Sequence, residues 1–348
     1  MKHFKSSIVF TIVCLVLAAA WGFHSGSAEA AMKDILIALI LGVLEVSLSF
    51  DNAVVNASTL EEMDEIWRHR FLTWGMIIAV FGMRLVFPIV IVSIIAWLNP
   101  FEVISMALTK PDKYAEYLTS SHEMISSFGG MFLLMVFFKY ILDPEKELHW
   151  IEPLEKVLVK IGKIESFEIF LSLAVLLGAQ AIAEPTHKLS ILISGIAGLM
   201  TFMLVDGVSS LMENAEEGKH STNVGDVVKK GGLATFLYLE LLDASFSFDG
   251  VIGAFAISND IIIIATGLAI GAMFVRSLTL FLVDKGTLAE YIFLEHGAHY
   301  AIGVLAFIMM LSVKFHISEV FTGLSGVFFI GISVWSSILH RKKEELKS

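Results

Sequence analysis

The stretch LEVSLSFDNAVV, residues 44–55, carries two acidic side chains, Glu45 and Asp51, inside a long apolar segment. An acidic side chain at the centre of a bilayer costs roughly 3 kcal/mol or more, so such residues are kept mainly for function. The surrounding segment is long and apolar enough to cross a membrane, which takes about 20 helical residues. We therefore expect a membrane-spanning helix with a polar site inside it.

The composition of the whole chain favours an integral membrane protein. Of its 348 residues, 56% are hydrophobic and only 17% are charged. A soluble protein of this length could not cover so much apolar surface, so the expected surrounding is a lipid bilayer. The formal net charge of −11 argues against a nucleic-acid partner. The single cysteine, Cys14, rules out an internal disulfide and gives no basis for a thiolate metal cluster.

Apolar segments of spanning length recur along the chain. We predict an all-α polytopic bundle of nine to ten transmembrane helices, at residues 6–24, 33–59, 72–98, 122–142, 167–184, 189–211, 233–257, 260–283, 297–313 and 318–339. Most lysines and arginines then fall on one side, together with both chain ends. Because cytoplasmic loops carry the excess of positive charge, we expect a multi-pass protein of the bacterial cytoplasmic (inner) membrane with a cytoplasmic C-terminus.

The domain organisation follows from these spans. Residues 1–30 fit two descriptions, a signal peptide with a small-x-small motif after its apolar run or a first transmembrane helix. Residues 31–340 are expected to form one membrane domain, and residues 341–348 a basic inner tail. The domain divides into repeat one at 33–142, connecting helices at 143–211, repeat two at 233–313 and a final helix at 318–339.

The acidic stretch has a second copy, LLDASFSFDGVI, at residues 242–253. Both copies contain the phrase S-x-S-F-D, preceded by an acid six positions before the aspartate. The alignment of the copies pairs four acids two by two: Glu45 with Asp243, and Asp51 with Asp249. We interpret the two stretches as equivalent positions of an internal repeat.

The spans that follow each acidic stretch also correspond. The second span of each set carries one arginine, Arg84 or Arg276, and the third opens with adjacent His and Glu residues. The two sets begin five spans apart, an odd number, so they are expected to cross the membrane in opposite directions. Such a 3+3 inverted-topology repeat is typical of secondary transporters, which bind substrate near the bilayer midplane.

The paired acids predict a cation-binding site. Two arginines against four acids leave a formal charge of −2, which one divalent cation would balance. Carboxylate, hydroxyl and amide oxygens suit hard ions such as Mg²⁺, Ca²⁺ or Mn²⁺, and imidazoles shift the preference toward Mn²⁺ or Zn²⁺. The predicted metal ligands are Glu45, Asp51, Asp243 and Asp249, with Arg84 and Arg276 as charge-balancing partners. Possible additional ligands are Ser49, Asn52, Ser247, Glu240, His122, Glu123 and His296.

Helical geometry leaves two arrangements open for each pair of acids. Glu45, Ser49 and Asn52 share one face of a regular helix, whereas Asp51 faces elsewhere. Either the helices break near Asn52 and Gly250, or the two acids of each stretch make separate contacts. A break at mid-membrane would also offer backbone carbonyls to a cation.

Five phrases of the sequence resemble the TerC-like integral membrane proteins: LEVSLSFDNAVVNA, FGMRLVFP, FGGMFLLM, LDASFSFDGVIGAFAI and LEHGAHYAIG. The resemblance covers roughly residues 33–338 and is greatest to a bacterial branch catalogued as a domain of unknown function. It implies membership of the LysE-like transporter superfamily, with a 3+3 inverted repeat. TerC-like proteins are associated with tellurium resistance, and several with manganese efflux. The extended phrase YLELLDASFSFDG and the early span at 6–24 depart from the commoner TerC pattern, so manganese is an implication of the resemblance alone.

These observations together predict a secondary transporter, not an enzyme, that exports a divalent cation, with manganese implied by the resemblance. The cation is the substrate, and no prosthetic group is expected. Two alternatives stay open. One is a non-transporting membrane partner in the response to metal or tellurium stress, and the other an intramembrane aspartyl hydrolase using Asp51 and Asp249. The acidic stretches lack the G-x-G-D pattern of such hydrolases. The sequence predicts no oligomeric state.

Overall fold

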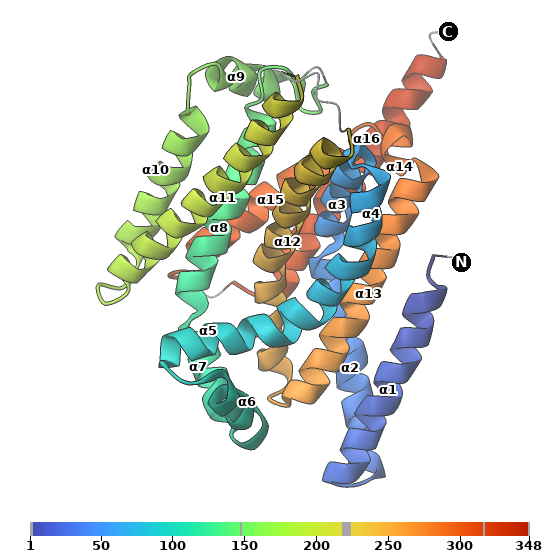
Figure 1. Ribbon diagram of the computed structural model, residues 1–348, viewed down its shortest axis with the longest axis vertical. Coiled ribbons are helices and arrows are strands. Elements are labelled where there is room, and N and C mark those ends of the chain that lie inside the picture. The colour runs from blue at the N-terminus through green and yellow to red at the C-terminus, as the bar shows by residue number, and fades with distance from the viewer. Residues whose placement is uncertain (1–2, 147, 218–223, 316, 347–348) are drawn as a thin grey trace.

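A computed structural model describes the chain except residues 1–2, 147, 218–223, 316 and 347–348. For a further set of residues it describes the backbone but not the side chain, namely 25, 62, 95, 209–217, 224–231, 234, 248–249 and 319–320. Every regular element of the described part is a helix, which confirms the predicted all-α class. The helices are α1 (Lys5–Ser25), α2 (Ala28–Leu48), α3 (Phe50–Glu62), α4 (Glu65–Arg70), η1 (Phe71–Gly75), η2 (Ile78–Val86), α5 (Phe87–Ala96), α6 (Pro100–Thr109), α7 (Pro111–Ser120), α8 (His122–Ile141), α9 (Glu152–Gly162), α10 (Phe167–Ile182), α11 (Lys188–Glu217), α12 (Val224–Ile257), α13 (Ile261–Lys285), α14 (Thr287–Glu290), α15 (Leu294–Leu311) and α16 (Glu319–Glu345) (Figure 1).

Six helices within the described residues are long and apolar enough to cross a membrane, namely α1, α8, α11, α13, α15 and α16. A seventh candidate is the bent pair Glu65–Gly75 and Ile78–Ile94. The other predicted spans also coincide with helices, but α10 has only 16 residues, and α2 and α12 contain the acidic residues that reduce their apolar character. The structure therefore shows a multi-pass helical bundle, and six or seven of its spans are clearly apolar within the described residues.

Helices α3 and α12, which bear most of the two acidic stretches, lie in the middle of the bundle, whereas α2 extends beside α1 toward one end (Figure 1). Helices α6 and α7 lie at one end, and α9, α14 and the C-terminus lie at the other (Figure 1). Helix α2 packs against α13, and η2 packs against α12. Helix α8 contacts both α12 and α15, and α3 contacts α15. Segments far apart in the sequence are thus interleaved around the acids.

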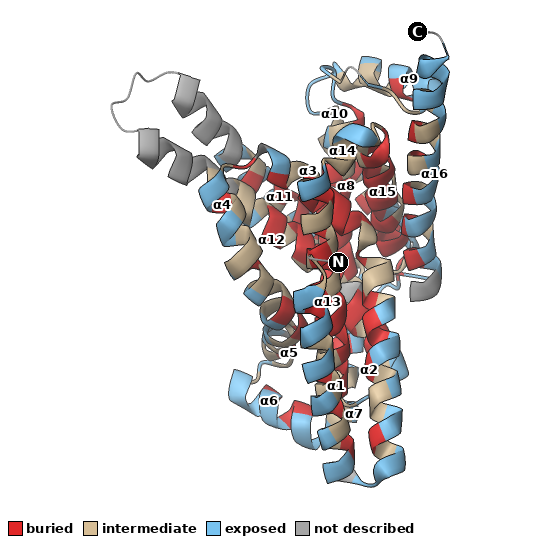
Figure 2. Ribbon diagram, turned by 90° about the vertical axis from the view of Figure 1, so that its right-hand side faces the viewer, coloured by how far each residue is buried: buried red, intermediate tan, exposed pale blue. Residues whose placement is uncertain are grey.

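Helices α1 and α16 carry many exposed residues (Figure 2). Many of these residues are large and apolar. Among them are Ile12 on the first helix and Leu324 and Trp335 on the last, the tryptophan being 66% exposed. Side chains of this kind gain stability by facing lipid rather than water. The interior between α8 and α15 is equally apolar, with Phe132 and Met309 fully or nearly fully buried. The few charged residues inside this bundle must therefore compensate one another.

The helix that carries Arg84 is bent and contains two π-helical segments, η1 and η2. The bend between Glu65–Gly75 and Ile78–Ile94 is 41°. A π-helical turn holds one extra residue, which disturbs the regular hydrogen bonding and is a recognised cause of helix kinks. The kink places η2 against α12, which carries the second acidic stretch.

Candidate functional site

The centre of the candidate site is a buried arginine that bridges two acids from different parts of the chain. The Arg84 Nη2 atom lies 2.5 Å from Glu45 Oε1, and its Nη1 atom lies 3.2 Å from Asp243 Oδ2. Both acids are buried. They occupy matching positions of the two acidic stretches, so the tertiary structure brings the two stretches together at this arginine.

The π-helical segment η2 sets the position of the bridging guanidinium. Its Nη1 atom also donates to the carbonyl oxygen of Ala79, five residues earlier in the chain, at 2.5 Å. Helical turns of this kind are rare and occur frequently at functional sites. The sequence places Arg84 on a neighbouring span but gives no sign of the π-helix that aims it.

Contacts between the two acidic stretches are reciprocal. The amide nitrogen Nδ2 of Asn52 donates to Asp243 Oδ1 at 2.7 Å. At the matching position of the second stretch, Gly250 lies against Glu45, since a Cβ atom added there would be 2.6 Å from Glu45 Oε2. Asn52 lies seven positions after Glu45 and contacts Asp243, and Gly250 lies seven positions after Asp243 and approaches Glu45. A side chain at Gly250 would displace Glu45, so glycine is needed for this close approach.

The first acidic helix is interrupted for a single residue, Ser49, where α2 ends and α3 begins. Its backbone N–H still donates to the Glu45 carbonyl at 3.0 Å, and Ala53 N–H donates to the Ser49 carbonyl at 3.2 Å. The Ser49 hydroxyl donates to Glu45 Oε1 at 3.3 Å. The distortion is therefore slight and lies three residues before Asn52. Helix α12 continues through Gly250 without a break.

The second acid of the first stretch faces a different neighbour. Asp51 is buried and accepts a hydrogen bond from the Asn52 backbone N–H at 3.0 Å. A Cβ atom added at Gly326 of α16 would lie 3.6 Å from Asp51 Oδ2. Glu45 and Asp51 thus contact different helices. This agrees with a nearly regular helix, in which the two acids face different directions and make separate contacts. The side chain of Asp249 lies outside the described residues.

Several polar atoms at the bridge and beside it are buried without a hydrogen-bond partner among the described residues. At the bridge they are Asn52 Oδ1 and Arg84 Nε. Beside it they are the two carboxylate oxygens of Glu240 and the amide oxygen of Asn56, and both of these residues are more than nine-tenths buried. The hydroxyl of Ser247 is also buried and unpartnered in the described structure. Asn56 was missed by the sequence analysis, although it lies one helical turn after Asn52 on the same face.

A cavity of about 40 Å³ lies beside the bridge. It is lined by Asn56, Arg84, Glu240, Asp243 and Arg276, together with apolar residues of η1, η2 and α13. Arg276 does not pair with an acid among the described contacts, because its Nε and Nη2 atoms donate to the Leu72 carbonyl at 3.0 and 2.5 Å. The two predicted charge-balancing arginines therefore have different surroundings.

The predicted ligands His122 and Glu123 lie at the start of α8, apart from the Arg84 bridge. The His122 Nε2 atom is 3.2 Å from the Ser126 hydroxyl. The Glu123 carboxylate pairs with His187 Nδ1 at 2.5 Å, in a partly exposed position. Both residues line an open cavity with Glu184 and Lys314 that does not include the bridge.

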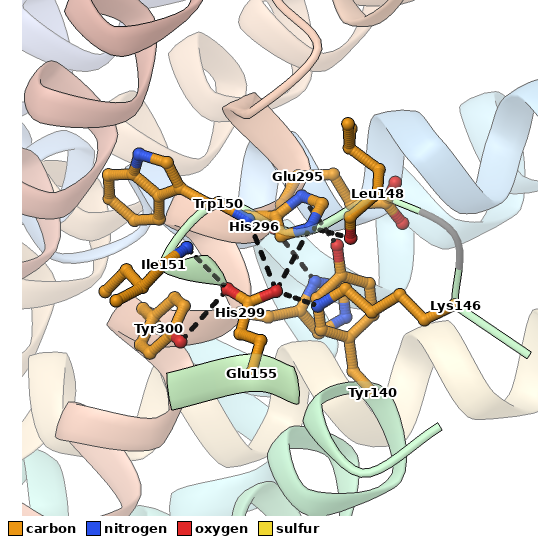
Figure 3. A network of polar contacts seen from close by, with 10 residues as sticks. All are labelled: Tyr140, Lys146, Leu148, Trp150, Ile151, Glu155, Glu295, His296, His299 and Tyr300. Atoms are coloured by element: carbon orange, nitrogen blue, oxygen red, sulfur yellow. Dashed lines mark hydrogen bonds and ion pairs between the residues drawn. The ribbon is translucent and has the colours of Figure 1, made fainter. Parts of the chain in front are cut away.

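The predicted ligand His296 belongs to a separate buried network between α8, α9 and α15 (Figure 3). Its Nε2 atom lies 2.9 Å from the Leu148 carbonyl, which can only accept, so this nitrogen carries the proton. In the neutral ring Nδ1 then accepts from the Tyr140 hydroxyl at 3.0 Å. The His299 ring stacks on Tyr140 with centroids 3.6 Å apart. These partners satisfy His296 without a metal.

The same network buries Glu155, which projects from α9 toward the bundle (Figure 3). Its carboxylate accepts from the Ile151 backbone N–H at 3.2 Å and from the Tyr300 hydroxyl at 3.1 Å, and Lys146 Nζ lies 3.1 Å away. Burial by itself would raise the pKa of Glu155, but the Ile151 N–H and the Lys146 charge outweigh it and hold the pKa below its ordinary value. The network thus fixes α9 to the end of the bundle.

We expect Glu155→Gln to lower the free energy of unfolding by about 1–3 kcal/mol at pH 7, because one charged acceptor of several hydrogen bonds is lost. Since the folded pKa is depressed, the charged form stabilises the fold above the ordinary pKa of about 4.3, and this contribution disappears as the pH falls through the folded pKa. Thermal unfolding in detergent, from pH 8 down to a pH below the folded pKa of Glu155, measures the difference. Glu152→Gln, on the exposed face of the same helix, is the control and should change little. Equal unfolding temperatures for Glu155→Gln and the unmodified chain at pH 7 would contradict the role given to this network.

No group of three or more His, Cys, Asp or Glu side chains in the described part of the chain is arranged to hold a metal ion. The structure instead brings together two acids, one arginine and the side-chain amides of Asn52 and Asn56, with Glu240 one helical turn before Asp243. This arrangement can hold a cation only if carboxylate and amide oxygens act together with water. Asp249, whose side chain is not described, is not part of this count.

Comparison with known proteins gives one family. The family described as protein of unknown function (DUF475) matches residues 50–344. The match contains the whole second acidic stretch and the part of the first stretch from Phe50 onward. No curated protein and no solved structure matches the chain. Because the match covers most of the sequence and the fold is a multi-pass helical bundle, the chain belongs to the DUF475 family of membrane proteins.

Proposed function

We propose that this protein is a secondary transporter that exports a divalent cation through an acidic site between two repeats. The observation that carries the proposal is the buried bridge from Glu45 through Arg84 to Asp243. Its acids come from matching positions of two similar stretches, as expected where a substrate site lies between inverted repeats. The packing of α2 on α13 and of η2 on α12 supports the same plan, because each carboxylate helix contacts the arginine helix of the other set.

The charges at the bridge suit a divalent cation that competes with Arg84. The two carboxylates carry −2 together, and the arginine reduces this to −1. A divalent cation in place of the guanidinium would make the pair neutral, which lowers the cost of burying it. The Ala79 carbonyl offers Arg84 a partner when it withdraws. Arg84 is therefore proposed to occupy the acids whenever no cation is bound.

The substrate class follows from the donor atoms and the resemblance. Carboxylate and amide oxygens favour hard cations, and the TerC-like phrases imply manganese. Protons are the proposed coupling ions, because carboxylates that release a cation in an apolar interior readily bind protons. The proposed location is the bacterial inner membrane with a cytoplasmic C-terminus, and the excess of lysine and arginine on one side of the predicted spans supports it. No enzymatic activity and no prosthetic group form part of the proposal.

Transport by the purified chain in liposomes tests this function. We expect Mn²⁺ uptake faster than in protein-free liposomes with no other protein present, and a dependence of the rate on an imposed pH gradient. The same assay with Ca²⁺ and Zn²⁺ identifies the preferred ion. Glu123→Gln is a matched control, because Glu123 pairs with His187 away from the bridge. No uptake of any of these ions in either direction would contradict the transporter and favour a non-transporting membrane partner.

A further inference from the structure

We propose that Glu240, Asn56 and Asp243 form a second cation subsite, which holds a divalent cation before it displaces Arg84. This inference rests on the proposed function, since it concerns the route to the same bridge. The subsite is the cavity of about 40 Å³ described above. A buried water needs roughly 10–15 Å³ by the same kind of measure, so the cavity has room for one ion with one or two waters.

The unpartnered oxygens indicate that this cavity takes a ligand. Glu240 is 7% exposed and Asn56 is 6% exposed, yet neither carboxylate oxygen of Glu240 nor the amide oxygen of Asn56 has a partner in the described structure. A buried polar group without a partner costs about 1–3 kcal/mol, and more when it is charged. A cation bound between these oxygens would remove that cost.

The position of the cavity places it on one side of the bridge. Glu240 lies one helical turn before Asp243 on α12, and Asn56 lies one turn after Asn52 on α3. The cavity wall includes Phe71 and Gly75 of η1, the segment that follows α4 directly. A cation in this cavity would therefore approach the bridge from the α4 end of the bundle.

The subsite has no counterpart in the repeat. In the alignment of the two acidic stretches, Glu240 corresponds to Gly42, and Asn56 corresponds to Ala254. Neither glycine nor alanine can supply a side-chain oxygen. The repeat thus provides the shared bridge, whereas the extra oxygens serve only one of its two sides. Such asymmetry would favour loading of the bridge from that side.

The chemistry of the subsite suits a small hard cation. Two carboxylates and one amide provide oxygen atoms only, which Mg²⁺, Ca²⁺ and Mn²⁺ prefer, and waters would complete the coordination. Arg276 lines the same cavity and adds a positive charge that opposes binding. Its two donors are held by the Leu72 carbonyl. The affinity of the subsite should therefore respond in opposite directions to changes at Glu240 and at Arg276.

Equilibrium binding of Mn²⁺ to the purified full chain in detergent, followed by electron paramagnetic resonance of free Mn²⁺, tests the subsite. We expect Glu240→Gln to weaken binding at least tenfold, whereas Asn56→Asp and Arg276→Gln should strengthen it. Glu290→Gln, whose exposed carboxylate pairs with Arg341, is the control and should bind as the unmodified chain does.

A second variant keeps the charge of the subsite and changes only the position of the Glu240 carboxylate. A Cβ atom at Gly75 would lie 2.6 Å from Glu240 Oε1, so Gly75→Ala must displace this carboxylate. We expect weaker Mn²⁺ binding from this variant too. Size-exclusion profiles and unfolding temperatures show whether each variant is folded. If Glu240→Gln does not fold, Mn²⁺ binding by Gly75→Ala and Asn56→Asp decides whether the subsite exists.

The outcomes of the binding and transport experiments distinguish a failure of the subsite proposal from a failure of the transport proposal. Glu240-dependent Mn²⁺ binding without uptake in liposomes would leave the subsite in place and overturn the transport proposal. Uptake with an unchanged KM and unchanged Mn²⁺ affinity in folded Glu240→Gln would overturn the subsite and leave transport in place. Absence of Mn²⁺ binding by the unmodified chain, or weaker binding in Arg276→Gln, would also overturn the subsite.

Discussion

Replacement of Arg84 by methionine is expected to destabilise the folded bundle by about 3–5 kcal/mol. The guanidinium is the only described positive group in contact with both Glu45 and Asp243, and all three are buried. Methionine fills a similar volume but leaves two carboxylates without compensation, and breaking a buried ion pair by removing one partner typically costs this much. Thermal unfolding of the purified protein in detergent at pH 7 measures the loss.

A variant that lacks the two acids as well as the arginine shows whether the loss of stability comes from uncompensated charge or from lost packing. We expect the triple variant with Arg84→Met, Glu45→Gln and Asp243→Asn to recover most of the stability, because neutral amides need no counter-charge. Arg84→Lys should be intermediate, since a single ammonium cannot present two nitrogens to two carboxylates. An Arg84→Met variant that unfolds at the temperature of the unmodified chain would show that the bridge contributes no stability.

Asp243→Asn is expected to reduce cation uptake in liposomes about 100-fold while the protein still inserts and folds. The amide has nearly the shape of the carboxylate but lacks its charge, and the proposed site then offers one anionic ligand in place of two. The loss of about 3 kcal/mol of cation stabilisation corresponds to roughly two factors of ten in rate. Initial rates of Mn²⁺ uptake at equal protein density measure the effect.

Asp51→Asn provides the informative comparison. The sequence assigns Asp51 and Asp243 the same role as metal ligands, whereas the structure places Asp51 against α16, away from the Arg84 bridge. We therefore expect a smaller loss of uptake from Asp51→Asn than from Asp243→Asn. Equal losses would show that the cation contacts both acids during transport. Normal uptake by Asp243→Asn would contradict the proposed site itself.

The helical class and the location of the acids could be predicted from the sequence because both depend on local composition. Each predicted span coincides with one helix or with a run of consecutive helices, since long apolar runs satisfy their backbone hydrogen bonds internally in a membrane. Helices α2 and α12 carry the acids of the two stretches, which makes these helices less apolar than the other spans. The correspondence of Glu45 with Asp243 was likewise visible as a repeated phrase.

The sequence by itself determined which residues correspond, and only the tertiary structure decided which of them meet. Glu45 and Asp243 share Arg84, whereas Arg276, the arginine on the corresponding span of the second set, donates to the Leu72 carbonyl. The π-helix of η2 and the lack of a hydrogen-bond partner for the Glu240 carboxylate among the described residues left no pattern in the sequence. The physical reason is that a contact between helices depends on how each is rotated and bent against its neighbours, and packing between distant segments sets both.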